Sequence, residues 1–212
     1  IEARSGHLDR ALEYYDKTLK EDPGHIRARL NRCSIFMALD EGRKALDDAE
    51  ILLDLAPNFT LARFKKAEAE MVLGDWSNAR ADLEIVLEKA PHHHQALTQL
   101  ASCFIALNRH ERAETPLNEA LRISPNYAPA WHQRGLLYLE WGRDDNALSD
   151  FEAAVKCDSN HLDANLHIAA LHHEGERFDQ ASVGWRAVLA IDEEHVVAKT
   201  RLDECEIKLM SS

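Results

Sequence analysis

The chain has 212 residues, a formal net charge of −12 and a hydrophobic content of 45%. We expect no membrane span, because no run of about 18 apolar residues occurs, and no signal peptide, because the first residues are charged. The acidic balance argues against a nucleic-acid partner, since phosphate binding needs a basic face. The four cysteines show no CxxC spacing, which predicts neither a disulfide framework nor a zinc site and favours a cytoplasmic location.

Residues of the same kind recur along the chain at a fixed step of 34 residues. Alanine forms two such columns, at Ala11, Ala45, Ala79, Ala113, Ala147 and Ala181 and at Ala28, Ala62, Ala96, Ala130, Ala164 and Ala198. Small residues form a third, at Cys33, Ala67, Ala101, Gly135 and Ala169, and proline a fourth, at Pro23, Pro57, Pro91 and Pro125. A step kept in four columns indicates a repeated supersecondary unit.

The segment 128–160 carries the fullest version of this pattern. Its signature positions hold Trp131, Gly135, Tyr138, Gly142, Ala147, Phe151 and Ala154. This pattern resembles the tetratricopeptide repeat, and the resemblance extends over essentially the whole chain. It implies an all-α fold, a right-handed α-solenoid of stacked antiparallel helix pairs. Size favours the same fold, because a helix pair of about 34 residues cannot bury its own core and must stack on its neighbours.

In chain order, the pattern predicts a single solenoid over 1–212. It begins with a truncated repeat, 1–25, in which a turn at Gly6 precedes a helix from Asp9 to Lys20. Full repeats follow at 26–59, 60–93, 94–127, 128–161 and 162–195. The truncated start leads us to expect that the chain is a fragment, cut inside the first helix of a repeat.

The last predicted element is a capping helix, 196–212. Its apolar residues, at i, i+4, i+7 and i+11, are Ala198, Leu202, Cys205 and Leu209. The other positions are mainly charged, which gives the one apolar and one charged face that the end of a solenoid needs.

Twelve histidines raise the question of a metal site or a catalytic base. We interpret the histidine at the turn before 94–127 as a packing residue, because its column holds other rings: His93 with His25, Tyr127, His161 and His195. The sequence contains no HExxH motif, no nucleophile motif and no glycine-rich phosphate loop. We therefore predict no metal, no cofactor and no catalytic residue, and we expect that the chain is not an enzyme.

In the tetratricopeptide repeat family, the first helix of each repeat lines a concave groove. The resemblance therefore implies a non-enzymatic protein–protein interaction scaffold that binds a partner peptide or helix in this groove. The candidate contact residues are Arg27, Leu30, Asn31, Ser34, Phe64, Lys65, Glu68, Gln95, Gln99, His132, Gln133 and His167. Apolar side chains can hold the anchors of such a peptide, and amides can bond its backbone.

The stretch around Asn31 also resembles co-chaperone repeat domains, which hold the C-terminal carboxylates of heat-shock chaperones in a clamp of Lys, Asn and Arg. Asn31 matches an Asn of this clamp, and Lys65 stands where an Arg is found. Leu61 departs from the pattern, because the clamp has Lys there. One alternative is thus a co-chaperone adaptor whose partner is a chaperone or its client. Others are a substrate-recruiting segment of a larger enzyme and a self-associating solenoid.

Overall fold

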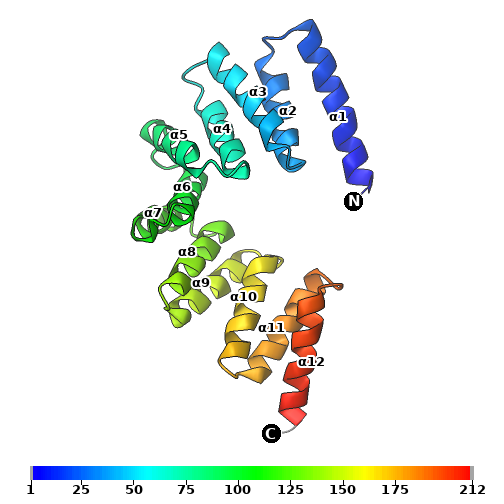
Figure 1. The fold of residues 1–212 in the computed structure, drawn as a ribbon, viewed down its shortest axis with the longest axis vertical. Coiled ribbons are helices and arrows are strands. Elements are labelled where there is room, and N and C mark those ends of the chain that lie inside the picture. The colour runs from blue at the N-terminus through cyan, green and yellow to red at the C-terminus, as the bar shows by residue number, and fades with distance from the viewer. Residues whose placement is uncertain (1, 211–212) are drawn as a thin grey trace. The chain divides into compact units, whose positions relative to one another are not determined.

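The computed structural model describes residues 2–210. Over these residues the chain forms twelve α-helices and one 3-10 helix, with no β-strand (Figure 1). The α-helices are α1 (Glu2–Glu21), α2 (Ile26–Ala38), α3 (Gly42–Leu55), α4 (Thr60–Val72), α5 (Trp76–Lys89), α6 (His94–Ala106), α7 (Glu114–Ile123), α8 (Ala128–Glu140), α9 (Asp144–Cys157), α10 (Leu162–Glu174), α11 (Phe178–Ile191) and α12 (Val196–Met210). The predicted all-α helical repeat fold is confirmed.

The first helix differs from the prediction near its N-terminus. α1 runs unbroken from Glu2 to Glu21, so the predicted turn at Gly6 is wrong. A glycine in a helix interior costs only about 1 kcal/mol relative to alanine, which is not enough to end a helix that continues on both sides. Ile1 of the predicted repeat 1–25 and residues 211–212 of the predicted capping helix lie outside the described residues.

The second helix of the segment 94–127 is shorter than its counterparts. The 3-10 helix η1 (His110–Arg112) precedes α7, which spans 10 residues, whereas α5 and α9 each span 14. Pro116 explains this, because proline has no N–H to donate and its ring clashes with the carbonyl four residues earlier, at Arg112. A helix tolerates proline only in its first turn, so α7 begins at Glu114.

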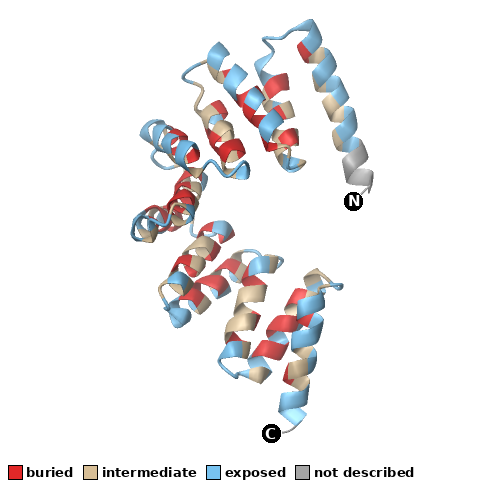
Figure 2. Cartoon of the chain, viewed as in Figure 1, coloured by how far each residue is buried: buried red, intermediate tan, exposed pale blue. Residues whose placement is uncertain are grey.

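The chain divides into two compact units, one up to Arg109 and one from His110. The first unit contains α1 to α6, and the second contains η1 and α7 to α12. Within each unit every α-helix packs against the next, and the buried residues lie between them (Figure 2).

Small residues let the paired helices approach closely. Five of the six alanines of one column are fully buried, namely Ala45, Ala79, Ala113, Ala147 and Ala181, whereas Ala11 is half-buried. The tightest contact is at Gly135 of α8, where a Cβ atom would lie 2.6 Å from Cε1 of Phe151 on α9. The sequence columns therefore mark the contacts between helices.

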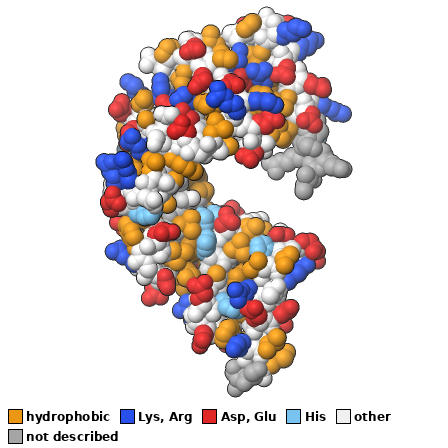
Figure 3. All heavy atoms as spheres, viewed as in Figure 1, with side chains coloured by type: hydrophobic (Ala, Val, Ile, Leu, Met, Phe, Trp, Pro, Cys, Tyr) orange, Lys and Arg blue, Asp and Glu red, His pale blue; other side chains and the backbone are white. Residues whose placement is uncertain are grey.

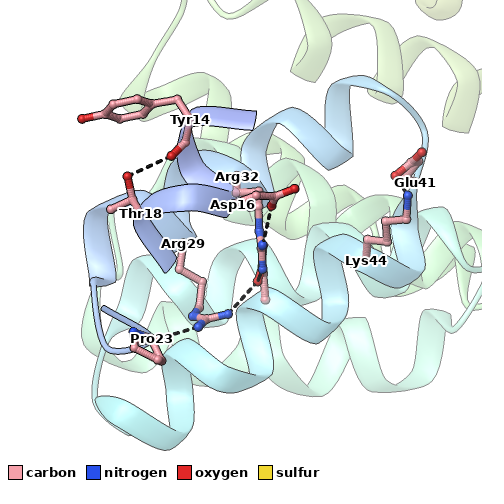
Figure 4. Close-up of polar contacts among 9 residues, drawn as sticks. Tyr14, Asp16, Thr18, Pro23, Arg29, Arg32, Glu41 and Lys44 are labelled. Carbon is pink, nitrogen blue, oxygen red and sulfur yellow. Dashed lines mark hydrogen bonds and ion pairs between the residues drawn. The ribbon is translucent and has the colours of Figure 1, made fainter. Parts of the chain in front are cut away.

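A buried carboxylate ties the first three helices together. Asp48 of α3 is 1% exposed and accepts hydrogen bonds from Nε and Nη2 of Arg32 at 2.8 and 2.6 Å and from Nη1 of Arg29 at 2.9 Å. Arg32 also pairs with Asp16 of α1 at 2.7 Å, and Arg29 donates to the carbonyl of Pro23 (Figure 4). The hydrogen bond to Asp48 raises the pKa of Arg32, so its guanidinium stays charged.

The ion pair recurs at multiples of the 34-residue step. Arg134 of α8 donates to both carboxylate oxygens of Asp150 on α9 at 2.7 and 2.8 Å, and Lys66 of α4 pairs with Asp82 of α5. The two partners are present or absent together, because a lone buried charge is costly. In the remaining two full repeats, neither position is charged: Leu100 with Pro116, and Ile168 with Gly184.

Four histidines cap helix N-termini. In each, Nδ1 accepts a hydrogen bond from the backbone N–H three residues later, a donor that the helix itself leaves unpaired. The pairs are His25–Ala28 at 3.1 Å, His93–Ala96 at 3.2 Å, His161–Ala164 at 3.3 Å and His195–Ala198 at 3.2 Å. These members of the predicted packing column thus have a more specific role in capping, which requires an unprotonated Nδ1.

His132 of α8 lies in the core of the second unit and is 9% exposed. Its ring centroid lies 4.8 Å from that of His161, 5.5 Å from that of His167 and 5.6 Å from that of Phe151. Burial, reinforced by the two neighbouring histidines, lowers the pKa of His132 to about 4. The imidazole is therefore neutral near pH 7.

Removing one partner of an ion pair should destabilise the protein more than removing both partners together. Asp150→Ala leaves Arg134, whose side chain is 18% exposed, without its counter-charge, and we expect the free energy of unfolding to fall by about 3 kcal/mol. The double variant Arg134→Leu/Asp150→Ala should lose less than the sum of the two single variants. Urea unfolding followed by circular dichroism measures these losses, and additive losses would contradict the coupling.

Acid should destabilise the protein through His132. Because its folded-state pKa of about 4 lies below the ordinary 6.5, the unfolded chain binds more protons between these pH values. The stabilisation is complete above pH 6.5 and is lost as the pH falls towards 4, with an amplitude of roughly 3 kcal/mol. His132→Leu should flatten this part of the pH dependence of unfolding, whereas His92→Leu, at an exposed site, should not. Equal slopes for both variants would exclude His132 as the titrating group.

Candidate functional site

Four candidate contact residues lie on α2, in the first unit. Arg27 and Asn31 are exposed, whereas Leu30 and Ser34 are half-buried. Asn31 Nδ2 donates to Oη of Tyr15 on α1 at 3.2 Å, and Ser34 Oγ donates to the carbonyl of Leu30 at 3.1 Å. Asn31 is therefore a surface residue that the preceding helix holds in place.

Three further candidates form one polar network across α4 and α6. Lys65 Nζ pairs with Glu68 Oε2 at 2.7 Å, and Gln99 Nε2 donates to Glu68 Oε1 at 3.0 Å. All three side chains are half-buried. Oε1 of Gln99 has no hydrogen-bond partner among the described residues. The network thus gives Lys65 a counter-charge and leaves one amide acceptor unfilled.

Phe64 of α4 lies in the core rather than on the surface. It is 5% exposed, and its ring centroid lies 4.7 Å from that of His93, the residue that caps α6. We expected a partner contact from Phe64, but burial gives it a packing role instead. Gln95, in the first turn of α6, is exposed.

The candidates of the second unit lie on α8 and α10. The structure brings the buried His132 and the half-buried His167 together, and His167 stacks on Phe151 at 4.7 Å between ring centroids and 15° between planes. Burial lowers the pKa of His167. His132 therefore has a packing role, whereas His167 packs on Phe151 and stays partly exposed. Gln133, beside His132 on α8, is half-buried.

A cysteine, a histidine and a glutamate meet between α10 and α12, which sequence reasoning did not foresee. Cys205 Sγ lies 3.4 Å from Nδ1 of His173, and His173 Nε2 lies 3.4 Å from Oε2 of Glu204. Such an order of groups can activate a nucleophile. However, Cys205 is fully buried, and burial raises the pKa of its thiol, which disfavours the reactive thiolate. The only sequence signal was the place of Cys205 on the apolar face of 196–212, and that signal indicates packing.

Within residues 2–210, no group of three or more His, Cys, Asp or Glu side chains is arranged to hold a metal ion. Among the same residues, no helix combines the length and the apolar character needed to cross a membrane. On the face of the first unit seen in Figure 3, Lys and Arg side chains lie beside Asp and Glu side chains. A mixed surface of this kind suits a protein partner better than a polyanion.

Family comparisons agree with the helical architecture. Residues 1–58 and 64–128 match a tetratricopeptide repeat model, and residues 128–161 match a second model with the same description. A search of curated proteins returned no significant match.

Several solved structures share the fold. The tetratricopeptide repeat protein TTC0263 of Thermus thermophilus is 22% identical, with a TM-score of 0.73 over 86% of this chain and 99% of that one. Yeast Tom70 is 17% identical, with a TM-score of 0.75 over 94% of this chain and 43% of that one. YrrB, described as a tetratricopeptide repeat protein with an unusual peptide-binding site, is 21% identical, with a TM-score of 0.59 over 89% of this chain and 97% of that one. The family models cover more than half of the sequence, and the chain belongs to the tetratricopeptide repeat family.

Proposed function

We propose that this chain is a non-enzymatic scaffold that binds a peptide or helix of a partner protein on the first helices of its repeats. Membership of the tetratricopeptide repeat family supports a protein-interaction scaffold. The description of YrrB as having a peptide-binding site supports the choice of a peptide. A helical repeat offers an extended surface with few convergent pockets, which suits binding better than catalysis.

The observation that carries this proposal is a polar column on the first unit. Asn31, Lys65 and Gln99 occupy equivalent positions of α2, α4 and α6, one 34-residue step apart. α2 packs against α4, and the hydrogen bond from Gln99 to Glu68 links α4 to α6. The exposed amide of Asn31 can bond a backbone group of a peptide, whereas the unpaired Oε1 of Gln99 is buried.

The charges around Lys65 favour an internal peptide segment over a chain terminus. A carboxylate clamp needs a concentration of free positive charge, but Lys65 is already paired with Glu68 at 2.7 Å. Leu61, where the clamp would have Lys, is apolar and 41% exposed. Arg27 is the remaining cation among the candidates, so a chaperone C-terminus would gain little charge stabilisation here.

Loss of the Asn31 amide should weaken peptide binding without loss of stability. Peptides selected from a displayed random library on the full chain are titrated against the wild type, Asn31→Ala and the matched control Asn146→Ala, an exposed site on α9. We expect one peptide class to bind Asn31→Ala about fivefold more weakly, since a lost hydrogen bond costs about 1 kcal/mol. If every class bound all three proteins equally, Asn31 would have no role in binding.

Removing the counter-charge of Lys65 should create a preference for carboxylate termini. In the wild type, an acidic synthetic peptide and its C-terminally amidated form should bind within about twofold of each other, whereas Glu68→Gln should favour the free carboxylate by about fivefold. Fluorescence titration measures both ratios. A strong carboxylate preference in the wild type would instead support the co-chaperone alternative.

A further inference from the structure

A second groove lies in the second unit, on the side of its repeats formed by α9 and α11. α10 packs against both of these helices and provides the floor, and the groove has a volume of about 530 Å³. Its apolar lining comes mainly from four residues, Val155, Ile168, Val183 and Ala187. None of these belongs to the candidate contact residues discussed above, so this surface is distinct from the one on the first helices.

The equivalent groove of the first unit is lined by charged side chains that pair with one another. Four 34-residue steps earlier, the corresponding groove is lined by α1, α2 and α3 and includes Asp16, Arg32, Phe36, Lys44 and Asp48. There Arg32 bonds both aspartates, and Lys44 Nζ lies 5.4 Å from the centroid of the Phe36 ring. The groove of the first unit therefore satisfies its own charges.

In the second unit an acidic residue is kept at the position of Asp16, but the position of Arg32 holds no cation. Glu152 stands at the position of Asp16, whereas Ile168 and Gly184 replace Arg32 and Asp48. Glu152 and Asp179 both line the groove. No ion pair to either carboxylate is formed by the described residues. Two exposed carboxylates beside an apolar floor make a site that lacks its positive charge.

Two further residues point to an occupant. Val183 is 66% exposed, a large exposure for an apolar residue beside other apolar groups. His172 lines the floor and is 9% exposed, and its buried Nδ1 has no hydrogen-bond partner among the described residues. Burial, reinforced by the positive charge of Arg177, lowers the pKa of His172, so His172 is a neutral polar group rather than a cation. A ligand that complements this groove would therefore present apolar groups to the floor and a positive charge to the two carboxylates.

We propose that this groove binds an amphipathic helix of a partner protein, with aliphatic side chains on the floor and a Lys or Arg beside Glu152 and Asp179. A helix is favoured over an extended segment because it satisfies its own backbone hydrogen bonds. Of the two amides in the groove, Asn165 Nδ2 already donates to the carbonyls of Ser159 and His161, which leaves Gln180 as the one that could bond a strand.

The test uses the full chain and displayed random peptides of 16 residues as the probe, with the length set at about four helical turns. Selected peptides are titrated against the wild type, Val183→Lys and the matched control Val197→Lys, an exposed valine of α12 that does not line the groove. We expect a class of peptides with aliphatic residues at i and i+3 or i+4 and a neighbouring Lys or Arg. This class should bind Val183→Lys at least about tenfold more weakly and Val197→Lys as tightly as the wild type.

A charge reversal distinguishes direct recognition from a structural effect. Glu152→Lys should weaken binding of the selected peptide and restore it when the Lys or Arg of that peptide is changed to Glu. The proposal is overturned if no peptide class depends on Val183, if the dependent peptides are acidic, or if they lack a helical pattern. Asn31→Ala should leave this class unaffected, so failure here is separate from failure of the proposed function.

Discussion

The close approach of the two helices in each repeat is the constraint on which the rest of the structure depends. A Cβ on Gly135 would lie 2.6 Å from the Phe151 ring, and one on Gly184 would lie 2.8 Å from Cβ of Ala169. Helices this close leave little room for water, so a charge between them needs a protein partner. The ion pairs of Arg32, Lys66 and Arg134 with aspartates of the following helix meet this need.

The same constraint explains why the fold could be predicted and where the prediction failed. The close contact between the paired helices accepts only small residues and recurs in every repeat. A single sequence therefore shows it as a column of alanine. The prediction of a turn at Gly6 depended instead on the helix propensity of glycine, which differs from that of alanine by only about 1 kcal/mol. The structure has a continuous helix α1 at this position. Pro116 was visible in the sequence, but its effect on α7 required knowing how far it lay from the start of that helix.

The candidate site was harder to predict, because position in a repeat does not reveal how a side chain is already engaged. Phe64 and Lys65 are neighbours at predicted groove positions, yet one packs on His93 and the other pairs with Glu68. Glu68 lies on the same helix as Lys65, whereas His93 caps α6, two helices after Phe64. The repeat pattern therefore predicted the helices that carry the candidate residues, but not which of their side chains remain available.

The coupling between ion-pair partners also determines where a new surface can arise. A repeat that loses only its arginine keeps a buried aspartate without a partner, which costs several kcal/mol. It can therefore lose the pair only as a unit, as at Ile168 and Gly184. The outer acid is different, because Glu152 is exposed and remains hydrated without its cation. Loss of the inner pair thus leaves an apolar floor beside an unpaired carboxylate, and this combination favours an amphipathic partner with a positive charge.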